Sequence, residues 1–214
     1  EIGSGLVGSE MCIRDSAKGA ELVADTDRAS YPKFPGVIES YDETSEYNLG
    51  TWEGNPLPMF AGIITGLDVE NVLIYGKGMI NGNASKENWW KNPKVMVGAF
   101  RPRLFFLSHS QNVTLCGVTF KNSPSWTLHP YFSDNLKFYG VTINNPSDSP
   151  NTDGLDPESC KNVDIVGVKF SLGDDCIAVK SGKIYMGKKY KTPSENIHIC
   201  LLYTSPSPRD RSLS

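Results

Sequence analysis

Three aspartates in two short polar segments are the residues of this sequence best suited to acid–base chemistry. Asp153 lies in an Asn-Thr-Asp-Gly segment, and Asp174 and Asp175 lie in a Gly-Asp-Asp-Cys segment. Clustered carboxylates repel one another, so at least one is expected to keep its proton near neutral pH. A protonated acid beside an ionised carboxylate is what hydrolysis of a glycosidic bond requires. A divalent-cation site and ordinary turn chemistry are the alternatives that the residue types leave open.

This chemistry requires the two acidic segments to lie side by side, and the sequence between them predicts a strand that would bring them together. Residues 161–170 are typical of a strand, and Asp174 follows Asp153 by 21 positions (174 − 153). Neighbouring rungs of a coiled parallel β architecture lie about 4.8 Å apart, like paired strands. His129 precedes Asp153 by 24 positions (153 − 129), so we predict that His129, Asp153 and Asp174 line one outward face. Successive strand residues point to opposite faces, so Asp175 joins them only where the backbone is irregular.

A repeat between residues 70 and 199 predicts the scaffold. Each complete copy has an Asn, an aliphatic residue after it, another apolar residue two positions on, and a Gly five positions after the Asn. The copies start at Asn71, Asn112, Asn135, Asn162 and, incompletely, Asn196. Repeats of this length are typical of solenoids, and the units are too short for βαβ crossovers. We therefore predict an all-β fold, a right-handed single-stranded parallel β-helix represented by its N-terminal and central coils. An antiparallel β-sandwich is the weaker alternative.

The predicted coil gives the repeated residues definite places. The Asn side chains are expected to form a hydrogen-bonded ladder in the turn, and each Gly permits the bend before the next strand. Inward side chains of one copy should stack on those of the next: Val113, Leu115, Val118 and Phe120 on Leu136, Phe138, Val141 and Ile143. No segment has a strong helical period, and the lysines between 183 and 191 are expected in an exposed basic loop.

Both ends of the chain resemble translated sequencing adapter. Residues 11–16 and 200–210 correspond to the two strands of one transposase-type adapter. We therefore expect residues 1–16 and 200–214 to be non-native, and residues 17–199 to form one partial β-helix domain of a longer protein. On that expectation the lack of a leader peptide says nothing about secretion, and the sequence leaves the cellular location open.

Composition gives no reason to expect a nucleic-acid or membrane partner. The 214 residues contain 21 Lys and Arg against 24 Asp and Glu, a net charge of −3, and no apolar run approaches the ~18 residues of a membrane span. Outside the two ends, Cys116, Cys160 and Cys176 show no metal-ligand spacing. We expect no metal and no cofactor, and a monomer when the protein is full length.

The motifs around the three aspartates resemble glycoside hydrolase family 28, the polygalacturonases and related pectin hydrolases, and in particular its bacterial, often exo-acting branch. Further matches lie at 76–83, 89–90, 101–102, 122–130 and 181–182, so the resemblance covers most of residues 60–199. It implies a right-handed parallel β-helix and metal-free, inverting hydrolysis of α-1,4-linked galacturonan. It also implies that Asp174 is the general acid and that Asp153 and Asp175 position and deprotonate water.

Asn151, Lys180 and His129 are the candidates for substrate contacts. Asn151 opens the first acidic segment, Lys180 could meet a galacturonate carboxylate as a point charge, and His129 is a candidate through its rung position. The family pattern continues with Gly-His-Gly and Arg-x-Lys, neither of which occurs in this sequence. We therefore expect the 214-residue chain to be inactive by itself.

Two other functions fit a β-helix: a calcium-dependent pectate lyase, and a non-catalytic carbohydrate-binding or adhesin module. Two acidic motifs one turn apart argue against both. Chelator sensitivity and unsaturated products would support the lyase, and binding without bond cleavage would support the module. The sequence does not distinguish endo from exo attack, or homogalacturonan from substituted galacturonans.

Overall fold

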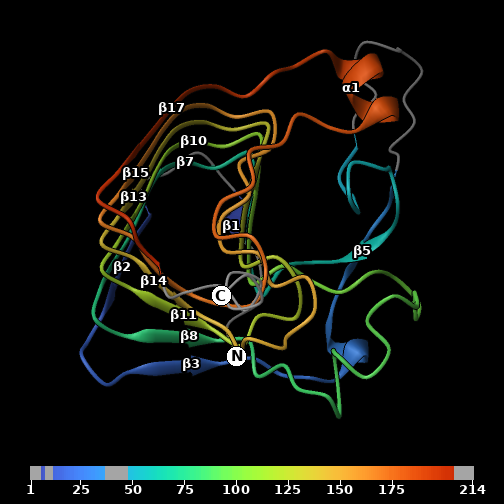
Figure 1. Cartoon of the computed structure of the whole chain (residues 1–214), viewed down its shortest axis with the longest axis horizontal. Coiled ribbons are helices and arrows are strands. Elements are labelled where there is room, and N and C mark those ends of the chain that lie inside the picture. The colour runs from blue at the N-terminus through green and yellow to red at the C-terminus, as the bar shows by residue number, and fades with distance from the viewer. Residues whose placement is uncertain (1–5, 8–11, 37–47, 205–214) are drawn as a thin grey trace, which may run out of the picture.

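The chain winds into stacked coils of parallel strands, as the computed structural model of residues 6–7, 12–36 and 48–204 shows (Figure 1). The first sheet consists of β1 (Leu6–Val7), β6 (Ile64–Leu67), β9 (Phe105–Ser108) and β12 (Leu128–Tyr131). The second consists of β2 (Cys12–Ser16), β7 (Glu70–Gly76), β10 (Gln111–Cys116), β13 (Asp134–Tyr139), β15 (Lys161–Val166) and β17 (Glu195–Cys200). The third consists of β3 (Glu21–Val23), β8 (Met79–Asn81), β11 (Thr119–Lys121), β14 (Thr142–Asn144), β16 (Lys169–Ser171) and β18 (Tyr203–Thr204).

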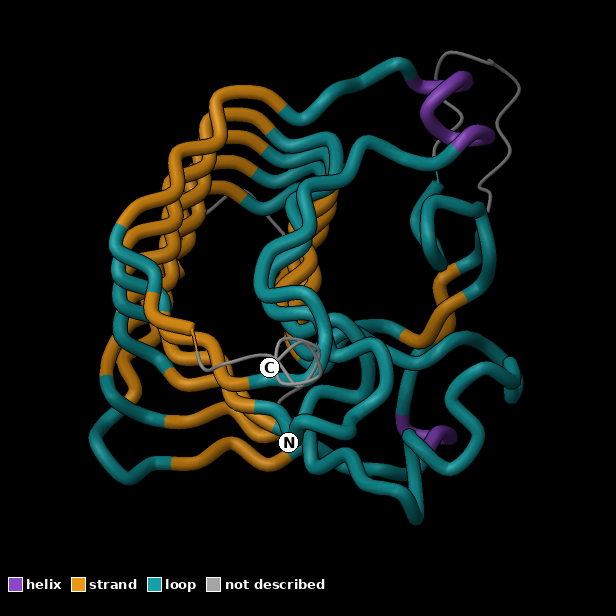
Figure 2. The backbone as a smooth tube through the Cα atoms, viewed as in Figure 1, coloured by secondary structure: helices purple, strands orange, loops and turns teal. Residues whose placement is uncertain are grey.

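Every pairing within these three sheets is parallel. Consecutive strands of the chain pass from sheet to sheet, and each strand pairs with its equivalent in the next coil (Figure 2). This arrangement is a right-handed parallel β-helix, so the predicted fold is confirmed. The sandwich alternative, which requires antiparallel strands, is excluded for the described residues.

The core is a stack of aliphatic and aromatic side chains inside the coil. Within the second sheet, Val113 pairs in register with Leu136, and Leu136 with Val163. Within the third, Phe120 pairs with Ile143, and these side chains are at most 1% exposed. The intervening residues of each strand point away from the core, which explains why the apolar positions of the repeat predict the register.

The asparagine ladder is also confirmed. Side-chain amides join Asn112 to Asn71 at 3.1 Å, Asn135 to Asn112 at 2.7 Å, and Asn196 to Asn162 at 3.0 Å. At one step the donor Asn162 reaches Asp134 instead, at 2.8 Å. The five repeated Asn residues have φ between 52° and 57°, a left-handed conformation that Asn tolerates better than most residues. The repeat therefore selects Asn for both its backbone and its amide.

The first sheet continues past β12 without regular strands. Leu128 bridges Leu155, which bridges Ile177, and in the same way Glu158 bridges Lys180. The loops on this side of the coil stack on one another although they lack strand geometry (Figure 2). Irregular backbone in this region lets consecutive residues face the same side, which the two acidic segments need.

β5 (Met59–Phe60) pairs antiparallel with β4 (Lys33–Phe34) and precedes β6 in the chain. One local prediction was wrong. The expected basic loop contains helix α1 (Ile184–Tyr190), which buries only Met186 and therefore shows little apolar period. A 3₁₀ turn occupies Arg28–Ser30. No helix among the described residues is long and apolar enough to cross a bilayer.

The segments with adapter-like sequence lie at the open ends of the coil. β2 and β18 pair with β7 and β16, and in this register Arg14 matches Ile74 and Thr204 matches Phe170. Complete coils carry aliphatic or aromatic residues at those positions. The open edge of a parallel sheet accepts almost any extended segment, so this pairing does not distinguish native from non-native sequence.

Candidate active site

An open cavity of about 430 Å³ lies beside the irregular continuation of the first sheet. Residues from three successive coils contribute to its wall, among them Trp126, Asn151, Asp153, Glu158, Asp174 and Lys180. Side chains on neighbouring coils come within a few ångströms of one another because the coils are one strand spacing apart. The cavity therefore collects residues that are far apart in the sequence.

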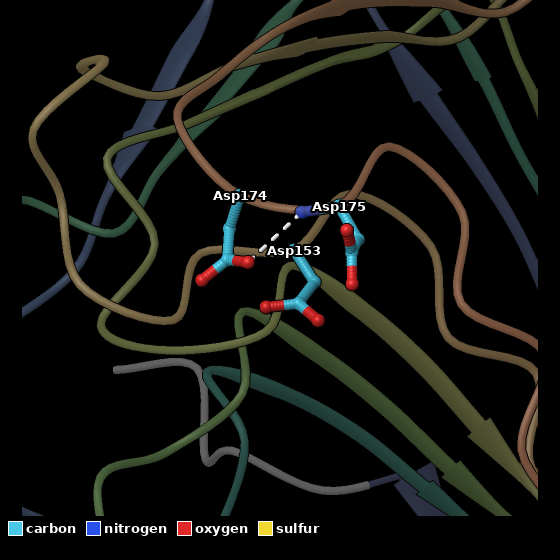
Figure 3. A group of neighbouring side chains, drawn as sticks. All are labelled: Asp153, Asp174 and Asp175. Carbon is cyan, nitrogen blue, oxygen red and sulfur yellow. Dashed lines mark hydrogen bonds between the residues drawn. The ribbon is translucent and has the colours of Figure 1, made fainter. Parts of the chain in front are cut away.

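The three aspartates lie close together (Figure 3), and two of them, Asp153 and Asp174, line this cavity. Each offers a carboxylate oxygen, and these oxygens lie within 4.8 Å of one another. Asp153 is buried, Asp174 is partly exposed and Asp175 is exposed. The prediction that the two acidic segments stack on neighbouring rungs is thus confirmed.

The register of the stacking differs from the expected one. The Gly154 amide donates to the carbonyl of Asp175 at 2.8 Å, so Asp153 lies over Asp175 and the coil spans 22 positions (175 − 153). Asp174 reaches the cluster because the chain bends after Gly173, where the Asp175 amide donates to Asp174 Oδ1 at 3.1 Å (Figure 3). A Cβ on Gly173 would collide with the backbone of Ser147. Glycine is therefore required there for close approach.

Burial and like charge perturb Asp153. Loss of hydration, followed by repulsion from Asp174, raises the pKa of Asp153 to about 6, and Lys180 opposes this shift. Asp153 therefore changes its charge near the middle of the physiological range. Asp153 is therefore a cavity-lining carboxyl that could exchange a proton with water near neutral pH.

Lys180 is placed in the cavity wall but is already engaged by the protein. Its Nζ lies 3.3 Å from Asp156 Oδ1 and 3.8 Å from Asp153 Oδ2, and 4.3 Å from the ring centre of Trp126. Asn151 also lines the cavity, with φ 55° and with Oδ1 accepting from Arg101 Nη2 at 2.8 Å. Both residues face the space that a ligand would occupy.

The expectation that His129 faces outward is wrong, because its side chain has no exposed surface. Leu128 bridges Leu155, so this coil spans 27 positions (155 − 128), and His129 lies beside Asp156 in the register. Arg103 Nε donates to His129 Nδ1 at 3.3 Å, which leaves the Nε2 hydrogen for Glu158 Oε2 at 2.9 Å. Burial lowers the pKa of His129 to about 4, so the imidazole is neutral and supports Glu158.

The sequence reasoning missed several charged residues of the site. Glu158 lines the cavity, and Arg103, completely buried, lies 4.2 Å from the ring centre of Trp126. Asp156 is 0% exposed, and neither of its oxygens accepts a hydrogen bond from any residue that the structure describes. Its contact with Lys180 is close but lacks hydrogen-bond geometry. A signal existed: Asp156 and Glu158 alternate along a stretch that follows the first acidic segment directly.

The distances among the three aspartates and Lys180 indicate how well this cluster would hold a divalent cation. Three carboxylate oxygens within 4.8 Å of one another could approach one ion. However, the Lys180 ammonium is 3.8 Å from Asp153 and would repel a cation there. The arrangement is better suited to holding a water molecule and a hydroxylated ligand than to holding a metal.

Comparisons with known proteins agree with this chemistry. The model of "Glycosyl hydrolases family 28" matches residues 42–199. A probable polygalacturonase of Vitis vinifera is 37% identical over 184 residues, 85% of this chain and 35% of that protein. An endo-polygalacturonase of Pectobacterium carotovorum subsp. carotovorum is 37% identical over 152 residues, 65% of this chain and 35% of that protein.

Solved structures give the same result. An exopolygalacturonase from Thermotoga maritima superposes with a TM-score of 0.68 at 25% identity, over 92% of this chain and 53% of that chain. A polygalacturonase from Erwinia carotovora ssp. carotovora superposes with a TM-score of 0.66 at 28% identity, over 92% of this chain and 50% of that chain. The chain spans about a third of the length of the curated relatives that it matches.

Proposed function

The chain belongs to the glycosyl hydrolases family 28, and on this basis we propose that it carries the acid–base site of a polygalacturonase, an enzyme that hydrolyses α-1,4-galacturonosidic bonds in pectin. The observation that carries the proposal is the cluster of Asp153, Asp174 and Asp175, whose oxygens lie within 4.8 Å of one another and of which Asp153 and Asp174 line the cavity. The matched family model and relatives favour neither a lyase nor a binding module.

In the proposed mechanism, Asp174 protonates the oxygen of the leaving sugar, while Asp153 and Asp175 hold a water molecule and remove its proton. Asp153 and Asp175 come from successive coils and face the same space. A water that makes two hydrogen bonds of about 2.8 Å can bridge oxygens up to about 5.5 Å apart. The observed separation of at most 4.8 Å is compatible with such a bridge. No step requires a metal.

The pH dependence tests the assignment of acid and base. Because the pKa of Asp153 is about 6, a base role predicts that activity rises as the pH increases through 6. Exchanged roles, with Asp153 as the proton donor, predict that activity falls over the same range.

We propose an inverting reaction, on the strength of the family resemblance. Carboxyl separations of about 6.5–9.5 Å are typical of inverting glycosidases and about 5 Å of retaining ones, so this cluster is compact for inversion. Proton NMR of the first product will decide: a β-anomer supports inversion, and an α-anomer from the α-linked substrate supports retention.

Asn151 and Lys180 are the proposed substrate contacts. Galacturonan carries a carboxylate on every sugar, and the Lys180 ammonium lies in the cavity wall 3.8 Å from Asp153. His129 supports Glu158 through its 2.9 Å contact, and because its side chain is fully buried it would have to become exposed to touch a sugar. We also propose that the full-length protein acts as a monomer.

The activity test must supply the family motifs that this sequence lacks. Because each coil of a solenoid contacts only its neighbours, residues 17–199 can be continued with the later coils of the Pectobacterium relative. We expect this chimera to release reducing ends from polygalacturonate, and D153N, D174N and D175N to lower the rate at least about 100-fold. The matched control is D164N in β15, on the second sheet. An active D174N variant, or cleavage that yields unsaturated products and stops with a chelator, would contradict the proposal.

We propose further that residues 17–199 are one partial β-helix domain and that 1–16 and 200–214 are adapter-derived. The adapter-like sequences of residues 11–16 and 200–210 support this. The test is to sequence the source DNA with primers outside both segments. Recovery of the same codons on both sides would refute it, and continuation into Gly-His-Gly and Arg-x-Lys codons would support the hydrolase as well.

A further inference from the structure

The Lys180 ammonium is shared between two carboxylates of unequal exposure. Its Nζ lies 3.3 Å from Asp156 Oδ1 and 3.8 Å from Asp153 Oδ2, and the Trp126 ring closes a third side at 4.3 Å. The Lys180 side chain is 23% exposed, that of Asp153 8% and that of Asp156 0%. The ammonium is therefore held at the cavity wall, nearer to the deeper carboxylate.

Asp156 has no other evident partner. Neither of its oxygens accepts a hydrogen bond among the residues that the structure describes, and its one ion-pair contact there is Lys180. A buried carboxylate without hydrogen bonds is costly. Burial, followed by repulsion from Asp153, raises the pKa of Asp156 well above its usual value, and the Lys180 ammonium is the main group that opposes this shift and favours the ionised form. The Lys180 ammonium, 3.3 Å from Oδ1, is the charged partner that this buried carboxyl attracts.

We propose that Asp156 is a positioning residue that holds the Lys180 ammonium away from Asp153, so that Asp153 stays available to water. Without Asp156, Lys180 would be drawn to Asp153 alone and would form a charge-assisted hydrogen bond of about 2.8 Å to its carboxylate. That bond would occupy Oδ2 of Asp153, the oxygen nearer to Lys180, and leave one oxygen for the proposed water. The inference rests on the proposed role of Asp153 as a base.

Several charged groups near Asp153 contribute to the pKa of its carboxyl. Asp174 and Asp175 lie on the following coil, Lys180 and Asp156 lie beside it, and Arg103 acts on it from the interior. Loss of Asp156 brings Lys180 closer and removes a carboxyl, and both changes lower the pKa of Asp153. Loss of Lys180 removes a positive charge that stabilises the ionised carboxylate, so it raises the pKa of Asp153. The two substitutions therefore act in opposite directions on one group.

The experiment is a pH titration of the Asp153 carboxyl by ¹³C NMR in the 214-residue chain, which requires no catalytic activity. We expect the midpoint to move down by about one pH unit in D156N and up by a similar amount in K180M. In the K180M background, D156N should lose most of its effect, because it acts through Lys180. D164N, far from the cavity on β15, is the control and should leave the midpoint unchanged.

Each outcome decides the matter. An unchanged Asp153 midpoint in D156N, or an equal downward movement with and without Lys180, would overturn the positioning role. D156L provides a second removal of the charge with similar volume, and it should produce the same movement if D156N folds poorly. If the titrations behave as expected while D153N leaves hydrolysis by the chimera intact, the proposed function fails and the Lys180 arrangement stands.

Discussion

Replacing Asp153 with Asn should make the protein more stable at neutral pH, because this carboxyl is ionised there at a cost. Its pKa is raised from 3.8 to about 6, first by loss of hydration and then by Asp174. The folded state therefore holds a proton between pH 4 and 6 that the unfolded state has released, so stability falls as the pH rises through this range. At 1.36 kcal/mol for each pH unit, the cost above pH 6 is about 3 kcal/mol.

The assay is urea unfolding of the wild type and D153N at pH 4, 5, 6 and 7. We expect no difference at pH 4 and a gain for D153N that grows to at most about 3 kcal/mol at pH 7. The lost contact with Lys180, 3.8 Å away, will reduce the gain. D164N, at a partly exposed Asp on β15 outside the cavity lining, is the control for the loss of an aspartate elsewhere on the coil. A D153N variant that is less stable at pH 7, or whose gain is the same at every pH, would refute the reasoning.

Two further predictions use other parts of the chain. The 214-residue chain should release no reducing ends from polygalacturonate, because its sequence lacks Gly-His-Gly and Arg-x-Lys; a measurable rate above a D174N control would contradict this. G173A should destabilise the protein by about 2 kcal/mol or more and displace the acidic bend, because the new Cβ would collide with the backbone of Ser147; urea unfolding beside the matched variant G140A, where nothing lies within 4 Å of a Cβ, checks it. G140A carries only the strain of its φ of 59°.

The fold could be predicted from the sequence because a solenoid is determined by local repetition. Each coil touches only its neighbours, so an Asn such as Asn112 and the apolar residues after it carry the information that sets the register. The ladder and the stacked core followed from these positions. The two ends could not be judged in this way, since an open coil edge pairs with sequences that lack the pattern.

The composition of the site was predictable only in part. Both acidic segments were located, but coil lengths of 27 and 22 positions on the cavity side depend on loops that carry no repeat. An assumed spacing of 24 therefore misplaced His129, which is buried beside Asp156. Asp156 and Glu158 were missed because an acidic residue near a turn normally indicates solvent exposure. Their burial arises from contacts between coils, such as that of Glu158 with His129 and that of Asp156 with Lys180.

The acids of the site are costly, and the neighbouring core must offset that cost. Leu155 connects the acidic site to the apolar core. It is 0% exposed, bridges Leu128 and Ile177, and lies between Asp153 and Asp156 in the chain. L155A should lower the free energy of unfolding by about 2–5 kcal/mol. It should also admit water beneath Asp153 and bring the pKa of that carboxyl back toward its ordinary value.

The matched variant is L136A in β13, which is equally buried but lies on the second sheet, away from the cavity. It should cost a similar free energy and leave the titration of Asp153 unchanged, because coupling in a solenoid is local. The measurement is unfolding in urea together with ¹³C titration of Asp153 in both variants. Equal movement of the Asp153 midpoint in the two would mean that the whole coil, rather than the layer under the acids, sets the protonation of the site.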